Sequence, residues 1–159
     1  MDVAREGPVL EAVDPFDLDE LVAASRALFV DEGSEPPGDR AHRVTLHRRL
    51  QRDARAWLFR SAPGTPVIAF ALASHRDDRT GTRLEQFRVE PAVRRLGWGR
   101  RCVNALLGGP LAGATSVEVR VLEDNPGAVA FWRALGFGHG TRRLAIEPRP
   151  AGPGPLRPD

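Results

Sequence analysis

Residues 89–100 read VEPAVRRLGWGR and carry the most informative pattern of the chain. Two glycines, Gly97 and Gly99, lie one residue apart where a strand passes into a helix, and arginines flank them. Glycine lets a ligand approach the backbone closely, and the first N–H groups of a helix lack intrahelical partners. The pattern therefore indicates a pyrophosphate site, although taken alone it also fits a glycine-rich helix start with solvated arginines.

Two familiar nucleotide-binding motifs do not fit this stretch. A dinucleotide-binding fingerprint needs a third small residue where the chain has Cys102, and it needs an acidic residue at a strand end, whereas Glu118 lies in mid-strand. A phosphate-binding loop of the Gly-Lys-Ser/Thr type needs a lysine, and the sequence contains none. Both motifs are therefore excluded.

Outward from this stretch, the apolar periodicity predicts an α/β domain. Strands are expected over residues 8–13, 56–60, 66–74, 83–89 and 116–121, and a last strand or hairpin over residues 137–147. Helices are expected after a capping box of Asp17 and Glu20, over residues 39–53, from Gly97–Gly99 to Gly108, and from Asn125 to Gly136. We expect a single domain over residues 1–147 and a disordered tail rich in proline and glycine over residues 148–159.

The composition limits the possible classes of protein. With 159 residues the chain is long enough for one domain with a core, and its formal net charge of +2 does not indicate nucleic-acid binding. No apolar run reaches the length of a membrane span and no signal peptide is visible, so we expect a cytoplasmic protein without a membrane partner. Cys102, the single cysteine, is expected to pack in the core, and no metal site is predicted.

A second motif lies downstream of the first and makes the pattern more specific. Residues 125–137 read NPGAVAFWRALGF and follow the first motif after one helix and one strand. The pair resembles the two central motifs of the GCN5-related N-acetyltransferase (GNAT) superfamily, in which Arg94-x-x-Gly97-x-Gly99 matches the loop for the pyrophosphate of acetyl-CoA. The resemblance covers residues 8 to about 147. It implies a central mixed, mostly antiparallel sheet flanked by helices, with two parallel strands splayed apart to form the acetyl-CoA slot.

The resemblance also implies which residues hold acetyl-CoA, the expected co-substrate. Backbone N–H groups from Arg95 to Arg100 would bind the pyrophosphate, and the backbone of residues 87–89 would pair with the pantetheine arm. Asn125 would orient that arm, although a plain helix N-cap is an equally good interpretation of this residue. The full set of expected cofactor-side residues is Phe87, Arg88, Val89, Arg94, Arg95, Leu96, Gly97, Trp98, Gly99, Arg100, Asn125, Phe131 and Trp132.

The implied reaction is direct attack of a neutral primary amine, on a small molecule or a peptide, on the acetyl thioester. Such an amine has a pKa near ~10.4, so a base is useful at neutral pH. Regular alternation would place Glu85 on the same strand face as Phe87 and Val89, in a partly apolar slot, and makes it the first candidate base. An ion pair with an arginine is the competing interpretation of Glu85. His75 is the second candidate base, with a solvated turn histidine as its alternative.

One residue departs from the family pattern. The family commonly has a tyrosine acid where this chain has Trp132, whose indole only donates a hydrogen bond. A non-catalytic acetyl-CoA-binding or interaction module on the same fold is therefore the alternative function. Three acidic residues, Asp31, Glu32 and Glu35, lie in a predicted loop and would attract a cationic amine or simply face water. A homodimer is possible within the family, but no interface is predicted.

Overall fold

The computed structural model describes residues 7–75 and 81–149. Its strands are β1 (Val9–Ala12), β2 (Ala54–Arg60), β3 (Val67–His75), β4 (Thr82–Val89), β5 (Val117–Leu122) and β6 (Arg142–Glu147). Its helices are α1 (Asp19–Asp31), α2 (Asp39–Arg52), the short η2 (Pro91–Val93), α3 (Trp98–Gly108) and α4 (Pro126–Ala134). Within these residues, no helix is long and apolar enough to cross a membrane.

The strands form one mixed sheet in the order β1-β2-β3-β4-β5-β6. The three pairings from β1 to β4 are antiparallel, and the pairings β4–β5 and β5–β6 are parallel. Parallel neighbours need a crossover, and α3 and α4 supply the two crossovers. The expected mixed, mostly antiparallel sheet flanked by helices is thereby confirmed.

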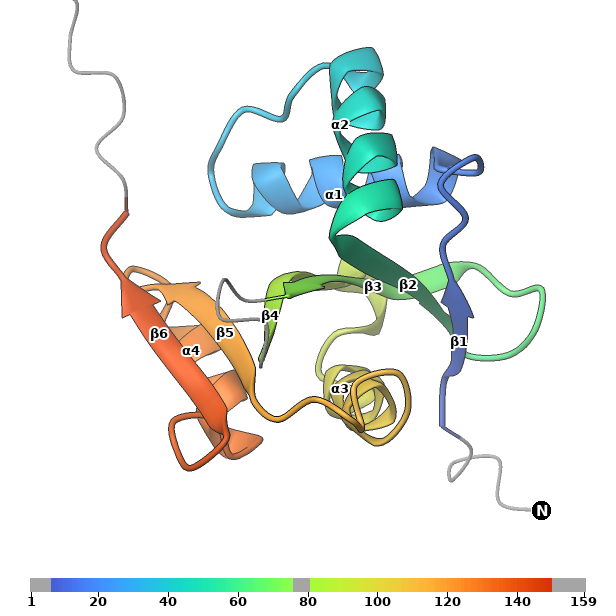
Figure 1. Cartoon of the computed structure of the whole chain (residues 1–159). Helices are drawn as coiled ribbons and strands as arrows, with labels where there is room; N and C mark the ends of the chain where they lie inside the picture. The colour runs from blue at the N-terminus through green and yellow to red at the C-terminus, as the bar shows by residue number, and fades with distance from the viewer. Residues whose placement is uncertain (1–6, 76–80, 150–159) are drawn as a thin grey trace, which may run out of the picture.

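Helices cover both faces of the sheet. Figure 1 shows α1 and α2 above the sheet and α3 below it. Because side chains alternate along β3, Phe70 and Leu72 join the core under α1 and α2, whereas the alanines at 69, 71 and 73 join the core against α3 and α4. The small alanine side chains leave room for the larger ones of α3 and α4, such as Leu106 and Trp132.

Several predicted boundaries were wrong. The first helix has Leu18 at its N-cap with no side-chain cap, so the capping box of Asp17 and Glu20 does not form. Asp14 organises this entry instead, because its carboxylate accepts from the Phe16 N–H and its carbonyl accepts from the Asp17 N–H. Within residues 137–147 the last strand covers only Arg142–Glu147, and a turn with an antiparallel bridge between His139 and Arg142 precedes it. Of the predicted tail, only Pro148 and Arg149 belong to the described residues.

Candidate functional site

A fork between β4 and β5 defines the candidate site. The two strands pair only from Thr82↔Val117 to Leu84↔Val119. Beyond Leu84, β4 continues to pair with β3 as far as Val89, but no longer with β5. Glu85–Val89 therefore presents one unpaired backbone edge toward β5, and Figure 1 shows β5 and β6 turned away from the other four strands. This fork is the predicted pair of splayed parallel strands.

A β-bulge lies at the point where the fork opens. Leu72 pairs with Gln86 and Ala73 with Leu84, so Glu85 is the extra residue of β4. The bulge breaks the alternation, and Leu84 and Phe87 both pack in the core on the α3 side. Glu85 and Gln86 both reach toward α1 and α2. The prediction that Glu85 shares a face with Phe87 and Val89 was therefore wrong.

Glu85 lies in a charged environment rather than in an apolar slot. Its Oε2 atom is 2.6 Å from Nη1 of Arg49 on α2, and its side chain is 24% exposed. Arg49 also reaches Asp53, at 3.8 Å from Nε to Oδ1. The competing interpretation of Glu85, an ion pair with an arginine, is confirmed in this structure. The residue still lies at the opening of the fork, on the α1 and α2 side.

Gln86 is held by a chain of buried side chains. The Ser25 hydroxyl donates to Oε1 of Gln86 over 2.8 Å, and Ser25 Oγ lies 2.8 Å from Nε2 of His42. Ser25 is fully buried and His42 is 7% exposed. Burial lowers the pKa of His42, Arg26 lowers it further, and Asp39 opposes the shift. His42 is therefore neutral between α1 and α2. The hydrogen bonds from His42 through Ser25 to Gln86 link both helices to β4.

His75 lies at the other end of the fork. It is the last residue of β3 and pairs with Thr82, on the closed side where β4 and β5 still share hydrogen bonds. Its side chain is exposed, as a turn histidine would be, and the residues that follow lie outside the described part of the chain. The structure does not bring His75 to the opening of the fork beside Glu85.

The loop after β4 leads directly into the start of α3. Arg95 and Gly97 have positive φ angles of 64° and 84°. The first helical bond of α3 runs from the Arg101 N–H to the Gly97 carbonyl, and no side chain caps the helix. Within the described residues, the N–H groups of Trp98, Gly99 and Arg100 therefore have no protein partner, as an anion site requires. Leu96 is 61% exposed on this loop.

Arg94 is tied to both neighbouring elements. Its Nε donates to the Val89 carbonyl over 2.8 Å, and its Nη2 donates to Asp31 over 2.9 Å. Arg88, 8% exposed, donates to the same Asp31 oxygen over 2.7 Å and to Glu90 over 2.8 Å. Burial of Asp31 pushes its pKa up, but the hydrogen bonds from Arg88 and Arg94 outweigh this and lower it. Asp31 is the last residue of α1 rather than a loop residue, and it is already paired.

The two glycines of the motif serve different structural needs. Gly97 adopts the left-handed backbone region that side chains disfavour. A Cβ atom on Gly99 would instead lie 3.1 Å from Cε2 of Phe131 and 3.5 Å from Val89. The missing side chain at Gly99 therefore makes room for α4 against α3, a packing role that the sequence did not suggest.

An aromatic cluster closes the base of the slot on the α4 side. Phe87 stacks on Phe131 with ring centroids 6.1 Å apart, and Trp132 meets Phe87 edge-on at 5.5 Å and Phe137 at 5.1 Å. Trp132 is 7% exposed and belongs to the core. At the start of α4, the Asn125 side chain accepts from the Ala128 N–H over 3.1 Å. The N-cap interpretation of Asn125 is confirmed, and its contact with pantetheine stays a prediction.

Cys102 belongs to the same core, as expected. It is completely buried, and burial raises the pKa of its thiol to about 12, so the thiol is not a nucleophile at neutral pH. Within the described residues, no group of three or more His, Cys, Asp or Glu side chains is arranged to hold a metal ion.

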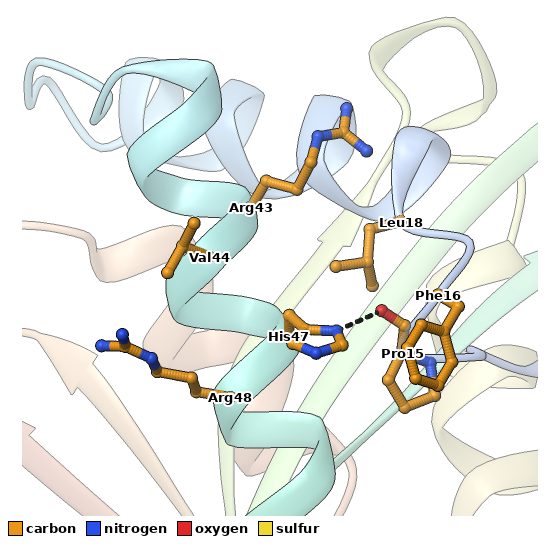
Figure 2. A pocket seen from close by; sticks show the side chains of 7 residues that line it. All are labelled: Pro15, Phe16, Leu18, Arg43, Val44, His47 and Arg48. Atoms are coloured by element: carbon orange, nitrogen blue, oxygen red, sulfur yellow. Dashed lines mark hydrogen bonds between the residues drawn. The ribbon is translucent and has the colours of Figure 1, made fainter.

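A separate hollow lies away from the fork, on the outer side of α2. Figure 2 shows it between α2 and the segment before α1. Phe16 and His47 lie close together there, and the His47 ring forms a hydrogen bond with the Pro15 carbonyl. Its volume is about 320 Å³. The residues that line it are Pro15, Phe16, Leu18, Arg43, Val44, His47 and Arg48. None of the residues of the fork or of the loop takes part in it.

The family model of the acetyltransferase (GNAT) family matches residues 19–137. No curated protein sequence matches the chain. The fold is similar to an acetyltransferase from Thermus thermophilus, with a TM-score of 0.70, 23% identity and coverage of 83% of this chain and 87% of that one. It is also similar to an aminoglycoside 6'-N-acetyltransferase from Acinetobacter baumannii, with a TM-score of 0.66, 21% identity and coverage of 92% and 100%. An aminoglycoside N-acetyltransferase in complex with CoA matches with a TM-score of 0.62, 20% identity and coverage of 92% and 99%.

The chain therefore belongs to the acetyltransferase (GNAT) family, because the family model spans most of its length and includes both motifs. Acetyl-CoA is the co-substrate of this class of transferase.

Sequence reasoning missed the polar partners of the site. It identified Glu85 but not Arg49, and it did not find the contacts that join Ser25 to His42 and Gln86. The signal for His42 and Arg49 was faint, because the second helix is strongly polar and only His42 and Leu46 are buried in it. The bulge has no sequence signal here, because residues 83–89 alternate as a regular strand would.

Proposed function

We propose that this chain transfers the acetyl group of acetyl-CoA to a primary amine of a small molecule or peptide, by direct attack in a ternary complex. The observation that supports this most is the continuous path from the unpaired edge Glu85–Val89 into the open start of α3. The strand edge offers hydrogen bonds to an extended pantetheine arm, and the helix start offers N–H groups and a positive dipole to a pyrophosphate.

The same residues define how acetyl-CoA would be held. Backbone N–H groups between Arg95 and Arg100 would bind the pyrophosphate, with Arg94 fixing the loop through Val89 and Asp31. Phe87, Arg88 and Val89 would pair with pantetheine through their backbones, and Phe131 and Trp132 would form the apolar wall beneath. Exposed Leu96 on the loop and partly buried Trp98 at the start of α3 would border the cofactor.

The reaction then needs one base. The amine nitrogen attacks the carbonyl carbon and forms the C–N bond, and a backbone N–H of the 87–89 edge stabilises the oxyanion. The nitrogen gives its proton to Glu85, the C–S bond breaks, and CoA leaves as a thiolate that takes a proton from water. A thiol with a pKa near ~8.5 is an acceptable leaving group without a tyrosine acid. Trp132 therefore does not prevent turnover.

The acceptor is sought first among small amines. Several structures with this fold are aminoglycoside N-acetyltransferases, so aminoglycosides belong in the first panel together with simple alkylamines and peptide amines. Since the chain contains no lysine, it has no side-chain amine of its own to acetylate. Release of free CoA in the assay therefore reports the added acceptor.

The test begins with calorimetric titration of acetyl-CoA. Substituting Gly97 would mix charge with backbone strain, because its φ is 84°. Leu96→Glu places a carboxylate on the exposed part of the same loop, and Leu96→Gln is the matched neutral control. We expect Leu96→Glu to weaken binding about tenfold and Leu96→Gln to leave it nearly unchanged, as for a repulsion of roughly 1.4 kcal/mol near a protein surface.

Turnover separates the two candidate functions. The transferase is supported if the protein binds acetyl-CoA and releases free CoA in the presence of at least one amine, and if this release is lost in Glu85→Gln. Binding with no turnover of any amine would favour the non-catalytic module, for which the buried Trp132 is the supporting observation. Equal binding to the protein and to Leu96→Glu would remove the loop from the proposed site.

A further inference from the structure

The bulge in β4 brings two different polar groups to the same face. In a regular strand consecutive side chains point to opposite faces. Here Glu85 contacts Arg49 of α2 and Gln86 contacts Ser25 of α1, so both side chains lie on the face covered by these helices. Both follow Leu84, the last residue of β4 that pairs with β5. An acid and an amide therefore stand side by side where the fork opens.

The Gln86 amide oxygen faces the buried Ser25 and His42 side chains. With the Ser25 hydroxyl donating to Gln86 Oε1, Nε2 of His42 is the donor to Ser25 Oγ. A buried chain of this kind is costly unless every member is satisfied, and here each link measures 2.8 Å. The amide oxygen of Gln86 is thereby occupied. Within the described residues its NH2 group has no partner, and the residue is partly exposed.

Glu85 offers the complementary group. Its Oε2 atom is engaged by Arg49, whereas Oε1 has no hydrogen-bonding partner within the described residues. An ionised carboxylate only accepts hydrogen bonds, and the NH2 of Gln86 only donates them. The two neighbouring residues thus present one free acceptor and one free donor at the opening of the fork.

We infer that Glu85 and Gln86 together select an amine that carries a hydrogen-bond-accepting oxygen close to its nitrogen, as in a 1,2-amino alcohol. The nitrogen lies at Glu85 and the oxygen accepts from the Gln86 NH2. This inference rests on the proposed function and adds the class of acceptor to it. An amine without that oxygen leaves the Gln86 donor without its partner once the acceptor covers it, which should lower kcat/KM roughly tenfold.

The test uses two amines that differ by one hydroxyl, phenethylamine and 2-amino-1-phenylethanol. For the wild-type protein we expect kcat/KM to favour the hydroxylated amine by about tenfold. In Gln86→Met the ratio of the two kcat/KM values should fall to near one, and in Gln86→Glu, which replaces the donor by an acceptor, it should fall as well. Gln51→Met makes the same chemical change at an exposed position of α2 and should keep the wild-type ratio. Comparing the kcat/KM ratio between protein variants cancels the effect that the hydroxyl has on the intrinsic reactivity of the amine.

Ser25→Ala tests the positioning chain. This substitution removes the hydrogen bond to the Gln86 amide, and Ser25 itself does not contact the amine substrate. The ratio of the two kcat/KM values should therefore fall part of the way toward one, while the KM for acetyl-CoA stays constant. Equilibrium binding of both amines to the CoA-bound protein separates recognition from turnover. Equal use of the two amines by the wild-type protein, or a preference that survives Gln86→Met, would overturn the inference and leave the transferase intact. If neither amine bound or reacted while another amine lacking the oxygen did, the inference would fail in the same way.

Discussion

At the scale of single residues, the loop motif combines a backbone requirement with a packing requirement. Gly97 is needed for its left-handed backbone, and Gly99 for the 3.1 Å approach that a Cβ would make to Phe131. Phe131 in turn stacks on Phe87, the β4 residue after the bulge. The glycine at position 99 therefore affects the slot indirectly, by letting Phe131 lie where it supports the strand edge.

Replacing Gly99 by alanine should show this link. The new methyl group has to displace the Phe131 ring, and overpacking of this kind costs about 1–3 kcal/mol in the free energy of unfolding. Urea unfolding of Gly99→Ala, Phe131→Leu and the double variant measures the coupling. We expect the smaller side chain at 131 to relieve much of the alanine's cost. Gly97→Ala is the matched control, since its backbone strain should not respond to Phe131→Leu, and strictly additive effects for Gly99 would contradict this account.

At the scale of elements, Asp31 joins the end of α1 to β4 and to the cofactor loop. It accepts from buried Arg88 and from exposed Arg94, and Arg94 in turn holds the Val89 carbonyl. Elements that are far apart in sequence thus meet at one carboxylate. Arg94, the first arginine of the loop, is thereby anchored to both β4 and α1.

Asp31→Asn should therefore affect both stability and cofactor binding. It leaves the Arg88 guanidinium, 8% exposed, with Glu90 as its remaining carboxylate, and we expect a loss of about 1–3 kcal/mol in urea unfolding. Titration should also show weaker acetyl-CoA binding, because Arg94 loses one of its two anchors. Glu35→Gln is the control, an exposed acidic residue in the next loop. Unchanged affinity in Asp31→Asn would mean that the Val89 bond alone fixes the loop.

The elements were largely predictable, and their contacts were not. Apolar periodicity and the glycine, proline and asparagine signals predicted the described β-strands and α-helices in the right order, because those signals are local. The short helix η2 and several boundaries were not predicted. The two motifs also gave the fork and the loop, although the role of each residue in binding stays a prediction. The bulge at Glu85 depends on how β4 pairs with β3, and the partners Arg49, Asp31 and His42 depend on helix packing. Such long-range pairings have no local pattern in one sequence.

At the scale of the whole molecule, one sheet separates two cores. Leu46 and Phe70 belong to the core under α1 and α2, and Leu106 and Val119 to the core on the α3 side. Glu85 and Gln86 of β4 face the helices over the first core, and Phe87 and Val89 pack against the second. His42 stands at the edge of the first core, so its protonation state bears on the stability of the molecule as a whole.

The free energy of unfolding should decrease on mild acidification. Burial lowers the pKa of His42 in the folded protein below 6.5, so below that pH the unfolded chain binds the extra proton. The contribution of neutral, buried His42 to the free energy of unfolding is fully present above pH 6.5. It is lost as the pH falls toward the pKa of His42 in the folded protein, by at most about 1.4 kcal/mol for each pH unit. Urea unfolding from pH 8 to pH 5 measures the slope. His42→Gln should be less stable at pH 8 and show a shallower slope, and an identical slope would contradict the assignment to His42.

Trp98, at the first position of α3, gives the molecule an optical label where the cofactor is expected. Its ring lies under the guanidinium of Arg101, with 4.7 Å from Cζ to the ring centroid. The chain has three tryptophans and no tyrosine, and the other two, Trp57 and Trp132, are 2% and 7% exposed. Ultraviolet emission therefore comes from two shielded indoles and one partly exposed indole at the start of α3. A shift in the exposed fraction of that emission would report events at the start of α3 without any attached dye.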